Sequence, residues 1–467
     1  MKRSQQLALA STLSFVCFNG FLLFAQTPAT TPPSSSQAGT PPAAASNVMI
    51  EQLKNPNAST RAKAARELGR AQDVSGLPAL AEAVSDPSDK VRREVVLALA
   101  QMHQPEVLDA LVKATQDDDE EISVLAVQSL VGYYTGNVPT PGFTGFVKKN
   151  WQRAKGHFSA DTTRIDPGVY VDPKVIAALD ATLKSTQSIH ASCEAAKGLG
   201  ILAARSALPD LVAAAHSSDE ALSIESLNAL SKIKDRSAGP RLLDLLDSPN
   251  KEIKQQASVT VGILRTAQAA PKLRYIFEND SDPKSQERAM EGLAYLGDAA
   301  SIPAYTKALG SADKDIRTSA AEGLARARDP KVLPDLEKAY AVEKDAETRL
   351  ALEFAMTSLG RPDYLIDLVN ELSSRTRGDT AQPYLIELAR ISGFLPKLYP
   401  YLQSANADVR KRLCTVLMFG GDQTSLAQLD RLSHDPNSDV AAQALQAKSG
   451  LRARLAAAGT ASDENSP

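Results

Sequence analysis

Histidine and cysteine side chains are the residues of this chain best suited to bind a metal or act as nucleophiles. None of the histidines lies in an HExxH motif or at another ligand spacing. They are His103, His157, His190, His216 and His434. The three cysteines, Cys17, Cys193 and Cys414, also lack metal-site spacing and are too few for a disulfide scaffold. We therefore expect no metal, no cofactor and no catalytic residues, and Cys193 and Cys414 are expected to be small buried core residues.

Two short motifs are better explained by structure than by ligand binding. The run GLGILA from Gly198 looks like a dinucleotide loop, but it ends a predicted helix and no strand precedes it. The acidic run from Asp117 to Glu121 does not have the ligand spacing of a calcium loop. Because acids near a helix N-terminus are favoured by the helix dipole, we interpret this run as a cap.

One segment, residues 133–170, carries side chains suited to binding a partner. Aromatic residues are only 5% of the chain but gather here, and the bases outnumber the acids Asp161 and Asp166. Aromatic and arginine side chains are enriched in binding hot spots. The candidate partner-binding residues are Tyr133, Tyr134, Phe143, Phe146, Lys148, Lys149, Trp151, Arg153, Lys155 and Phe158.

The spacing of Phe143, Phe146 and Trp151 predicts a short amphipathic helix in this segment. We favour the interpretation that it folds back and plugs a groove over the alternative that it is a free docking site. Plugging the groove and docking a partner are compatible roles for this segment. Binding to an anionic membrane surface is a further, less favoured interpretation, because it requires a free apolar face.

Length and composition limit the architecture that can carry this segment. The chain has 467 residues, 43% of them hydrophobic, and a formal charge of -3. Single cores stop growing near ~250 to 300 residues, so the length indicates either several domains or a fold that extends in one dimension. The low aromatic content favours the second. The net charge argues against a nucleic-acid partner, which would require an excess of basic residues.

The two ends of the chain are expected to lie outside the folded part. Residues 1–25 have a basic start, an apolar run and Ala25 at a plausible cleavage site, which predicts a signal peptide and a periplasmic or extracellular location. An uncleaved membrane anchor is the alternative. Residues 26–46, rich in Pro, Thr, Ser and Ala, predict a disordered linker, and residues 459–467 predict a disordered tail.

A repeat of about 31 residues fills the region between, residues 47–458. The stretch NPNASTRAKAARELG from Asn55 recurs as DPSDKVRREVVLALA from Asp86 and as DDDEEISVLAVQSLV from Asp117. Within each unit the apolar residues have helical spacing on both sides of a turn, which predicts two antiparallel helices. Prolines such as Pro78 and Pro209 suit the first turn of the first helix. Since one such pair cannot cover its own apolar face, about twelve should stack into an elongated, curved all-α solenoid.

These units resemble HEAT repeats, particularly the short alanine-rich subtype of the phycobilisome lyases. The matching feature is an acid, an apolar residue and a base at the start of the second helix, as in DIRTSAAEGL with Asp315 and Arg317 and in DVRKRLC with Asp408 and Arg410. The resemblance implies a superhelix in which such residues form a ladder between units. Ser123, Ser223 and Ala441 replace the base in their units, so the ladder should be discontinuous.

These observations favour a monomeric, exported, non-enzymatic scaffold or adaptor that binds a protein or peptide partner. The alternatives are a lyase-like or chaperone-like protein that acts on a chromophore or a modified protein, which only the resemblance implies, and envelope-surface binding through the basic aromatic segment. A visible chromophore in the purified protein would favour the lyase-like alternative. Salt-sensitive sedimentation with anionic vesicles would favour the surface-binding one.

Overall fold

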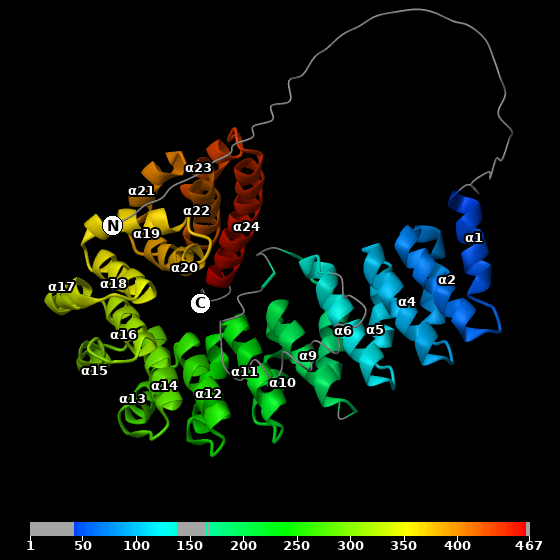
Figure 1. The fold of residues 1–467 in the computed structure, drawn as a ribbon, viewed down its shortest axis with the longest axis horizontal. Helices are drawn as coiled ribbons and strands as arrows, with labels where there is room; N and C mark the ends of the chain where they lie inside the picture. Colours follow the sequence, from blue (N-terminus) through cyan, green and yellow to red (C-terminus); the bar gives the residue numbers. More distant parts are fainter. Residues whose placement is uncertain (1–41, 138–163, 166–168, 186, 464–467) are drawn as a thin grey trace, which may run out of the picture.

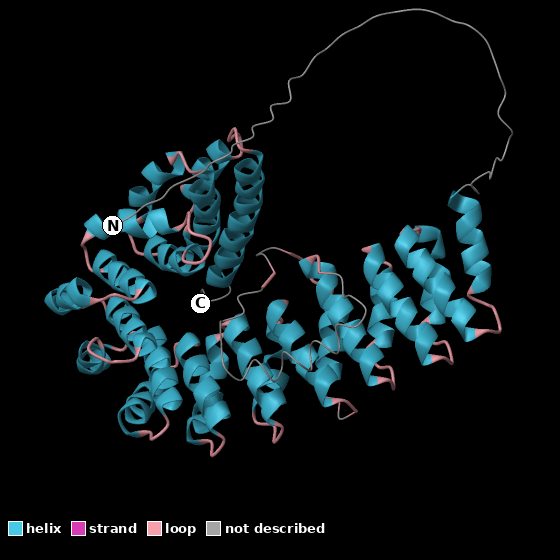
Figure 2. Cartoon of the chain, in the orientation of Figure 1, coloured by secondary structure: helices cyan, strands magenta, loops and turns pink. Residues whose placement is uncertain are grey.

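A computed structural model describes residues 42–137, 164–165, 169–185 and 187–463 of the chain. Within these residues every regular element is helical, as expected (Figure 2). The helices form twelve hairpins, each with a first and a second helix, which confirms the predicted solenoid.

The first helices are short, and the sixth and part of the eleventh are 3-10 helices. They are α1 (Pro42–Gln52), α3 (Leu77–Ala83), α5 (Val107–Ala114), α8 (Pro173–Leu183), α10 (Leu208–Ala215), η3 (Arg236–Asp247), α13 (Ala270–Asn279), α15 (Ile302–Ala308), α17 (Leu333–Val342), α19 (Leu365–Glu371), α21 (Leu395–Leu398) continued by η8 (Tyr399–Gln403), and α23 (Ser425–Leu432).

The second helices are longer. They are α2 (Ala58–Ala71), α4 (Asp89–Met102), α6 (Glu120–Thr135), α9 (Ile189–Ile201), α11 (Glu220–Ile233), α12 (Lys251–Ile263), α14 (Pro283–Leu296), α16 (Lys314–Ala327), α18 (Ala346–Ser358), α20 (Gly378–Ala389), α22 (Ala407–Gly420) and α24 (Ser438–Asp463). Short 3-10 turns precede several first helices, namely η1 (Val74–Gly76), η2 (Arg205–Ala207), η4 (Ala267–Ala269), η5 (Ala299–Ser301), η6 (Pro330–Val332) and η7 (Pro362–Tyr364).

Local chemistry explains where the second helices begin and end. Most begin after an Asn, Asp or Ser whose side chain accepts hydrogen bonds from the first free N–H groups, as Asp119 does from Glu121 and Ile122. Asp119 thus confirms the capping role predicted for its acidic run. Several end at a residue in the left-handed conformation, such as Gly297 with φ 61°.

Each second helix packs on the second helix of the next hairpin, so the core is a continuous row rather than one centre. Small residues allow close approach. A Cβ on Gly262 of α12 would lie 2.6 Å from the Cα of Gly292 on α14. Gly198 and Gly200, from the run that resembles a dinucleotide loop, lie inside α9 and are buried, and a Cβ on Gly200 would lie 2.7 Å from the Cα of Ala229.

The row of hairpins bends back on itself (Figure 1). From α1 to α12 it runs nearly straight, it turns through α13 to α18, and the returning arm of α19 to α24 faces the first part. In the turn, α13, α15 and α17 lie on the outside and the second helices on the inside (Figure 1). The curvature is therefore stronger at the C-terminal end than the elongated rod expected from the repeat alone.

The helices extend beyond the predicted folded part at both ends. Helix α1 begins at Pro42, within the predicted linker, and α24 continues to Asp463, within the predicted tail. The predicted signal peptide, residues 1–25, lies outside the described residues. Among the residues that are described, no helix combines the length and apolar character needed to cross a membrane.

Candidate functional site

A ladder of ion pairs connects the turns of successive hairpins. Arg92, at the start of α4, binds Asp117 of the next turn through Nε (2.7 Å) and Nη2 (2.8 Å), and its Nη1 donates to the carbonyl of Asp86 in its own turn (3.0 Å). The partner is thus the acid about 25 residues further on, not the nearby Asp89. The pairs are Arg61–Asp86, Arg92–Asp117, Lys254–Asp280, Arg317–Glu343 and Arg410–Asp435.

The ladder is discontinuous, as the sequence predicted. Ser123 and Ser223 replace the base, and their hydroxyls donate to the carbonyls of Thr115 (2.8 Å) and Ala215 (2.6 Å) within the same hairpin. Gln286 occupies an equivalent position and also bonds within its own turn, to the carbonyl of Asp280 (2.7 Å). Where the pairs exist they are strongly bonded: the hydrogen bond with Arg317 lowers the pKa of Glu343 to about 2.

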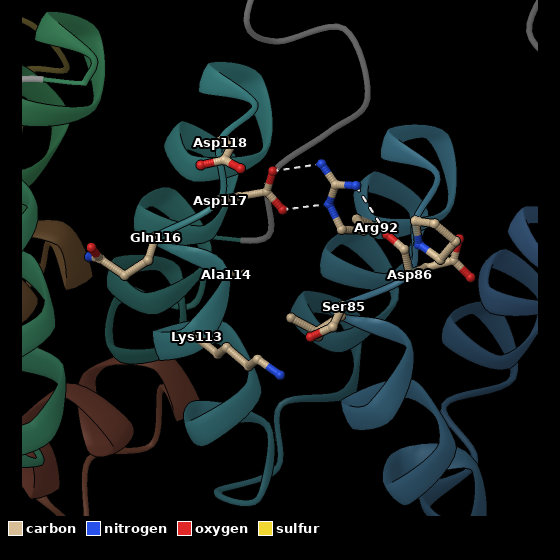
Figure 3. Close-up of a pocket in the computed structure, with 10 residues that line it drawn as sticks. Ser85, Asp86, Arg92, Lys113, Ala114, Gln116, Asp117 and Asp118 are labelled. Atoms are coloured by element: carbon tan, nitrogen blue, oxygen red, sulfur yellow. Dashed lines mark hydrogen bonds and ion pairs between the residues drawn. The ribbon is translucent and has the colours of Figure 1, made fainter.

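The turns of the second and third hairpins enclose a hollow of about 480 Å³. Figure 3 shows that Arg92 and Asp117, which both line it, are directly bonded to each other, with Asp86 on the other side of the guanidinium. The side chains of Arg92 and Asp117 are 18% and 6% exposed. Because Arg92 and Asp117 already satisfy one another, the ladder accounts for the charged pair that lines this hollow.

A second polar network lies on the inside of the bend, centred on Arg326 at the end of α16. Its guanidinium binds Glu387 of α20 through Nε (2.9 Å) and Nη2 (2.8 Å), although 61 residues separate the two. Its Nη1 donates to Glu322 (3.0 Å) and to the carbonyl of Ala294 (3.1 Å). Tyr384 of α20 donates to the other oxygen of Glu322 (2.5 Å). These bonds join the eighth hairpin to the tenth.

Aromatic rings surround this network. The Arg326 guanidinium lies 5.1 Å from the ring centroid of Tyr295 and 6.0 Å from that of Phe354, and Phe354 stacks on Tyr384 at 4.5 Å. Burial alone would raise the pKa of Glu387, but the charge and hydrogen bonds of Arg326, together with the charges of Arg265 and Arg390, outweigh it and hold this pKa below its usual value. Burial raises the pKa of Tyr384, which remains a neutral donor. The network is therefore a fixed structural clamp.

Of the predicted partner-binding residues, the structure describes only the first two. Tyr133 and Tyr134 lie on the last turn of α6 and are half-buried, so they belong to the solenoid. The hydroxyl of Tyr134 accepts a hydrogen bond from the backbone N–H of Asp172 (3.0 Å), and Tyr133 stacks on His103 with centroids 5.7 Å apart. Phe143, Phe146, Lys148, Lys149, Trp151, Arg153, Lys155 and Phe158 lie outside the described residues.

The side chains first considered for chemistry have structural surroundings. Cys193 and Cys414 are free and buried, as predicted, and burial raises the pKa of both thiols. The imidazole of His216 lies 3.1 Å from a carboxylate oxygen of Asp244. Within the described part of the chain, no three His, Cys, Asp or Glu side chains are grouped to hold a metal ion.

The clamp around Arg326 was not predicted from the sequence. Arg326 and Glu387 belong to units that are not adjacent, and helical spacing alone cannot indicate that they meet. The available signal was chemical: Glu322 and Arg326 are four residues apart on one helix, a spacing that places both side chains on the same face.

Comparison with known families identifies the repeat. The profile described as HEAT repeats matches residues 46–131, 173–262 and 270–357, which together are more than half of the chain. The protein therefore belongs to the HEAT-repeat family. The alanine-rich lyase subtype is not distinguished by this match. No curated protein matches the sequence.

Three solved structures are similar to parts of this chain. YibA of Escherichia coli shares 17% identity over 60% of this chain and 92% of its own, with a TM-score of 0.39. An engineered protein shares 17% identity over 87% of this chain and 98% of its own, with a TM-score of 0.37. Human deoxyhypusine hydroxylase in complex with glycerol shares 18% identity over 55% and 85%, with a TM-score of 0.25.

Proposed function

We propose that this protein is a non-enzymatic scaffold or adaptor that binds a protein or peptide partner along the inside of its curve. The observation that supports this proposal most directly is the unbroken row of second helices, which presents side chains from twelve hairpins along one extended side. Such a surface suits a long partner better than a small molecule. The charges with the most organised geometry, the ladder and the clamp, are used for structure.

The proposal includes export, based on the basic start and apolar run of residues 1–25. Expression of the full chain in a bacterial host, followed by fractionation and N-terminal sequencing of the purified protein, tests it. A mature protein in the periplasmic fraction that begins at Gln26 is the expected result. A full-length protein that remains in the cytoplasmic fraction contradicts export without affecting the scaffold role.

Cross-linking in the native host, followed by mass spectrometry, tests the scaffold role. The full chain is compared with a variant in which residues 138–163 are replaced by a Gly/Ser linker of equal length, which leaves α6 and its Tyr134 contact intact. Cross-links from the inner helices to one saturable partner are expected. Their loss in the variant would assign docking to the aromatic segment. The absence of any saturable partner in both proteins contradicts a scaffold.

The finer assignment to the lyase-like alanine-rich subtype is also part of the proposal. It is supported by the acid–apolar–base motif and by the small residues that let second helices approach closely, such as Gly262 and Gly292. A visible absorbance band in the protein purified from its native host would favour a role on a chromophore. A spectrum with only the protein band at ~280 nm argues against that role.

A further inference from the structure

Three second helices of the middle hairpins end in a cationic residue with a left-handed backbone. These residues are Lys234 after α11 (φ 59°), Arg265 after α12 (φ 53°) and Arg328 after α16 (φ 56°). A non-glycine residue in this conformation costs roughly 1 kcal/mol, and this chain uses Gly297 for the same purpose after α14. All three cationic side chains are exposed. Backbone geometry therefore does not explain why cations occupy these positions.

A fourth cation approaches them from the returning arm. Arg390 follows α20, and its charge, together with that of Arg164, adds to burial in lowering the pKa of Lys234. Arg265 has a lowered pKa because of burial, and the charge of Arg328 contributes in the same direction. Helix α11 packs on α12, and the bonds between Arg326 and Glu387 hold α16 against α20, so these cations belong to connected parts of the fifth, sixth, eighth and tenth hairpins. The guanidinium of Arg390 also donates to the carbonyl of Phe419 through Nε (3.3 Å) and Nη2 (3.0 Å). We call Lys234, Arg265, Arg328 and Arg390 the inner basic cluster.

The cluster is poorly neutralised by the protein itself. Within the described residues, the side chains of Lys234, Arg265 and Arg328 make no hydrogen bond or ion pair, in contrast to the ladder. The charge of Glu387 raises the pKa of both Lys234 and Arg265, but Arg326 already binds this carboxylate with two hydrogen bonds. The helix dipole favours one cation at each helix C-terminus. It does not account for cations brought together from opposite arms.

We propose that the inner basic cluster binds an acidic segment of a partner protein. This inference rests on the scaffold role and specifies its partner. Neighbouring helices stack at ~8 to 10 Å, so cations from several hairpins match charges spread along an extended chain better than one small anion. The net charge of -3 provides no broad positive field for a nucleic acid.

Fluorescence polarisation with the full chain tests the proposal. The probe is a labelled peptide of about twelve residues rich in Glu and Asp, and the control probe has Gln and Asn at the same positions. The cluster variant Lys234→Gln/Arg265→Gln/Arg328→Gln is conservative for the fold, because Gln72 already occupies the same left-handed position after α2. The matched control, Arg241→Gln/Lys307→Gln/Arg431→Gln, removes three exposed cations from the first-helix layer. Circular dichroism melts of both variants verify folding.

We expect saturable binding of the acidic peptide that weakens with salt, falls at least about tenfold in the cluster variant and changes less than about twofold in the control. Equal binding of the neutral peptide, equal loss in both variants, or no binding overturns the proposal. Tighter binding of a single-stranded oligonucleotide than of the peptide also overturns it, in favour of a nucleic-acid ligand. If the acidic peptide fails but cross-links to a partner persist, the scaffold role stands and only this inference falls.

Discussion

The clamp at the bend should make Arg326 the most important single charge for the returning arm. The substitution Arg326→Met keeps an unbranched apolar side chain but removes the guanidinium, and with it two bonds to Glu387, one to Glu322 and one to the carbonyl of Ala294. The Arg326 side chain is only 7% exposed, so water cannot replace all these bonds. Glu322 and Glu387 would then be two carboxylates without their shared cation.

The expected loss of stability depends on how deeply the charges of the ion pair are buried. Removing one partner of a buried ion pair costs about 3 to 5 kcal/mol, because the other charge is left uncompensated. An exposed pair contributes only about 0 to 1 kcal/mol. Arg66, which binds Glu94 through Nε at 3.0 Å and has a side chain 43% exposed, offers a matched control on neighbouring hairpins. We therefore expect Arg326→Met to destabilise the protein by several times more than Arg66→Met.

Urea denaturation and hydrogen exchange measure the two parts of this prediction. Denaturation should give the larger loss for Arg326→Met, and exchange should show lower protection in α18 to α24 while α2 to α6 remain unchanged, because hairpins depend mainly on their neighbours. The loss should be smaller at pH 5 than at pH 8. Without Arg326, burial raises the pKa of Glu387, and protonation at low pH removes its charge.

Equal costs for the two substitutions would refute the reasoning. So would a uniform loss of protection along the whole chain, which would mean that the clamp is not a local link between the eighth and tenth hairpins. The double variant Arg326→Met/Glu387→Leu provides a further check. It should recover part of the lost stability, because it no longer leaves Glu387 as a buried charge without a partner.

Three further predictions concern single side chains. Glu353 is 7% exposed and burial raises its pKa from 4.5 to about 7, so the native state binds more protons between these values and stability falls as pH rises through this window. Glu353→Gln, which still accepts a hydrogen bond from Tyr340, should remove this fall, which amounts to up to about 3 kcal/mol, in melts at pH 5 and 8. Gly262→Ala should cost about 1 to 3 kcal/mol in urea denaturation because its Cβ would meet Gly292, and an unchanged midpoint would disprove close packing there. Cys414 is fully buried with its pKa raised to about 12, so iodoacetamide should modify it only in urea, and modification of the native protein would show local opening.

Most of the fold could be predicted because its information is local. The repeat of turn residues and apolar positions indicated the hairpins, and capping residues such as Asp119 indicated where second helices begin. The base positions of the ladder, such as Arg92 and Arg317, were also visible. Their acidic partners, such as Asp117 and Glu343, were not assigned from the sequence, because the guanidinium reaches across to the next hairpin and the choice of partner depends on how two hairpins stack.

The amino-acid sequence by itself determined that this protein is a row of helical hairpins and not a single compact core, since each hairpin has an apolar face that only a neighbour can cover. Only the tertiary structure decided that the row bends back and that Arg326 meets Glu387. The physical reason is that curvature is the sum of small rotations between successive hairpins. Each rotation is set by side-chain packing at one contact, and no local periodicity records their sum.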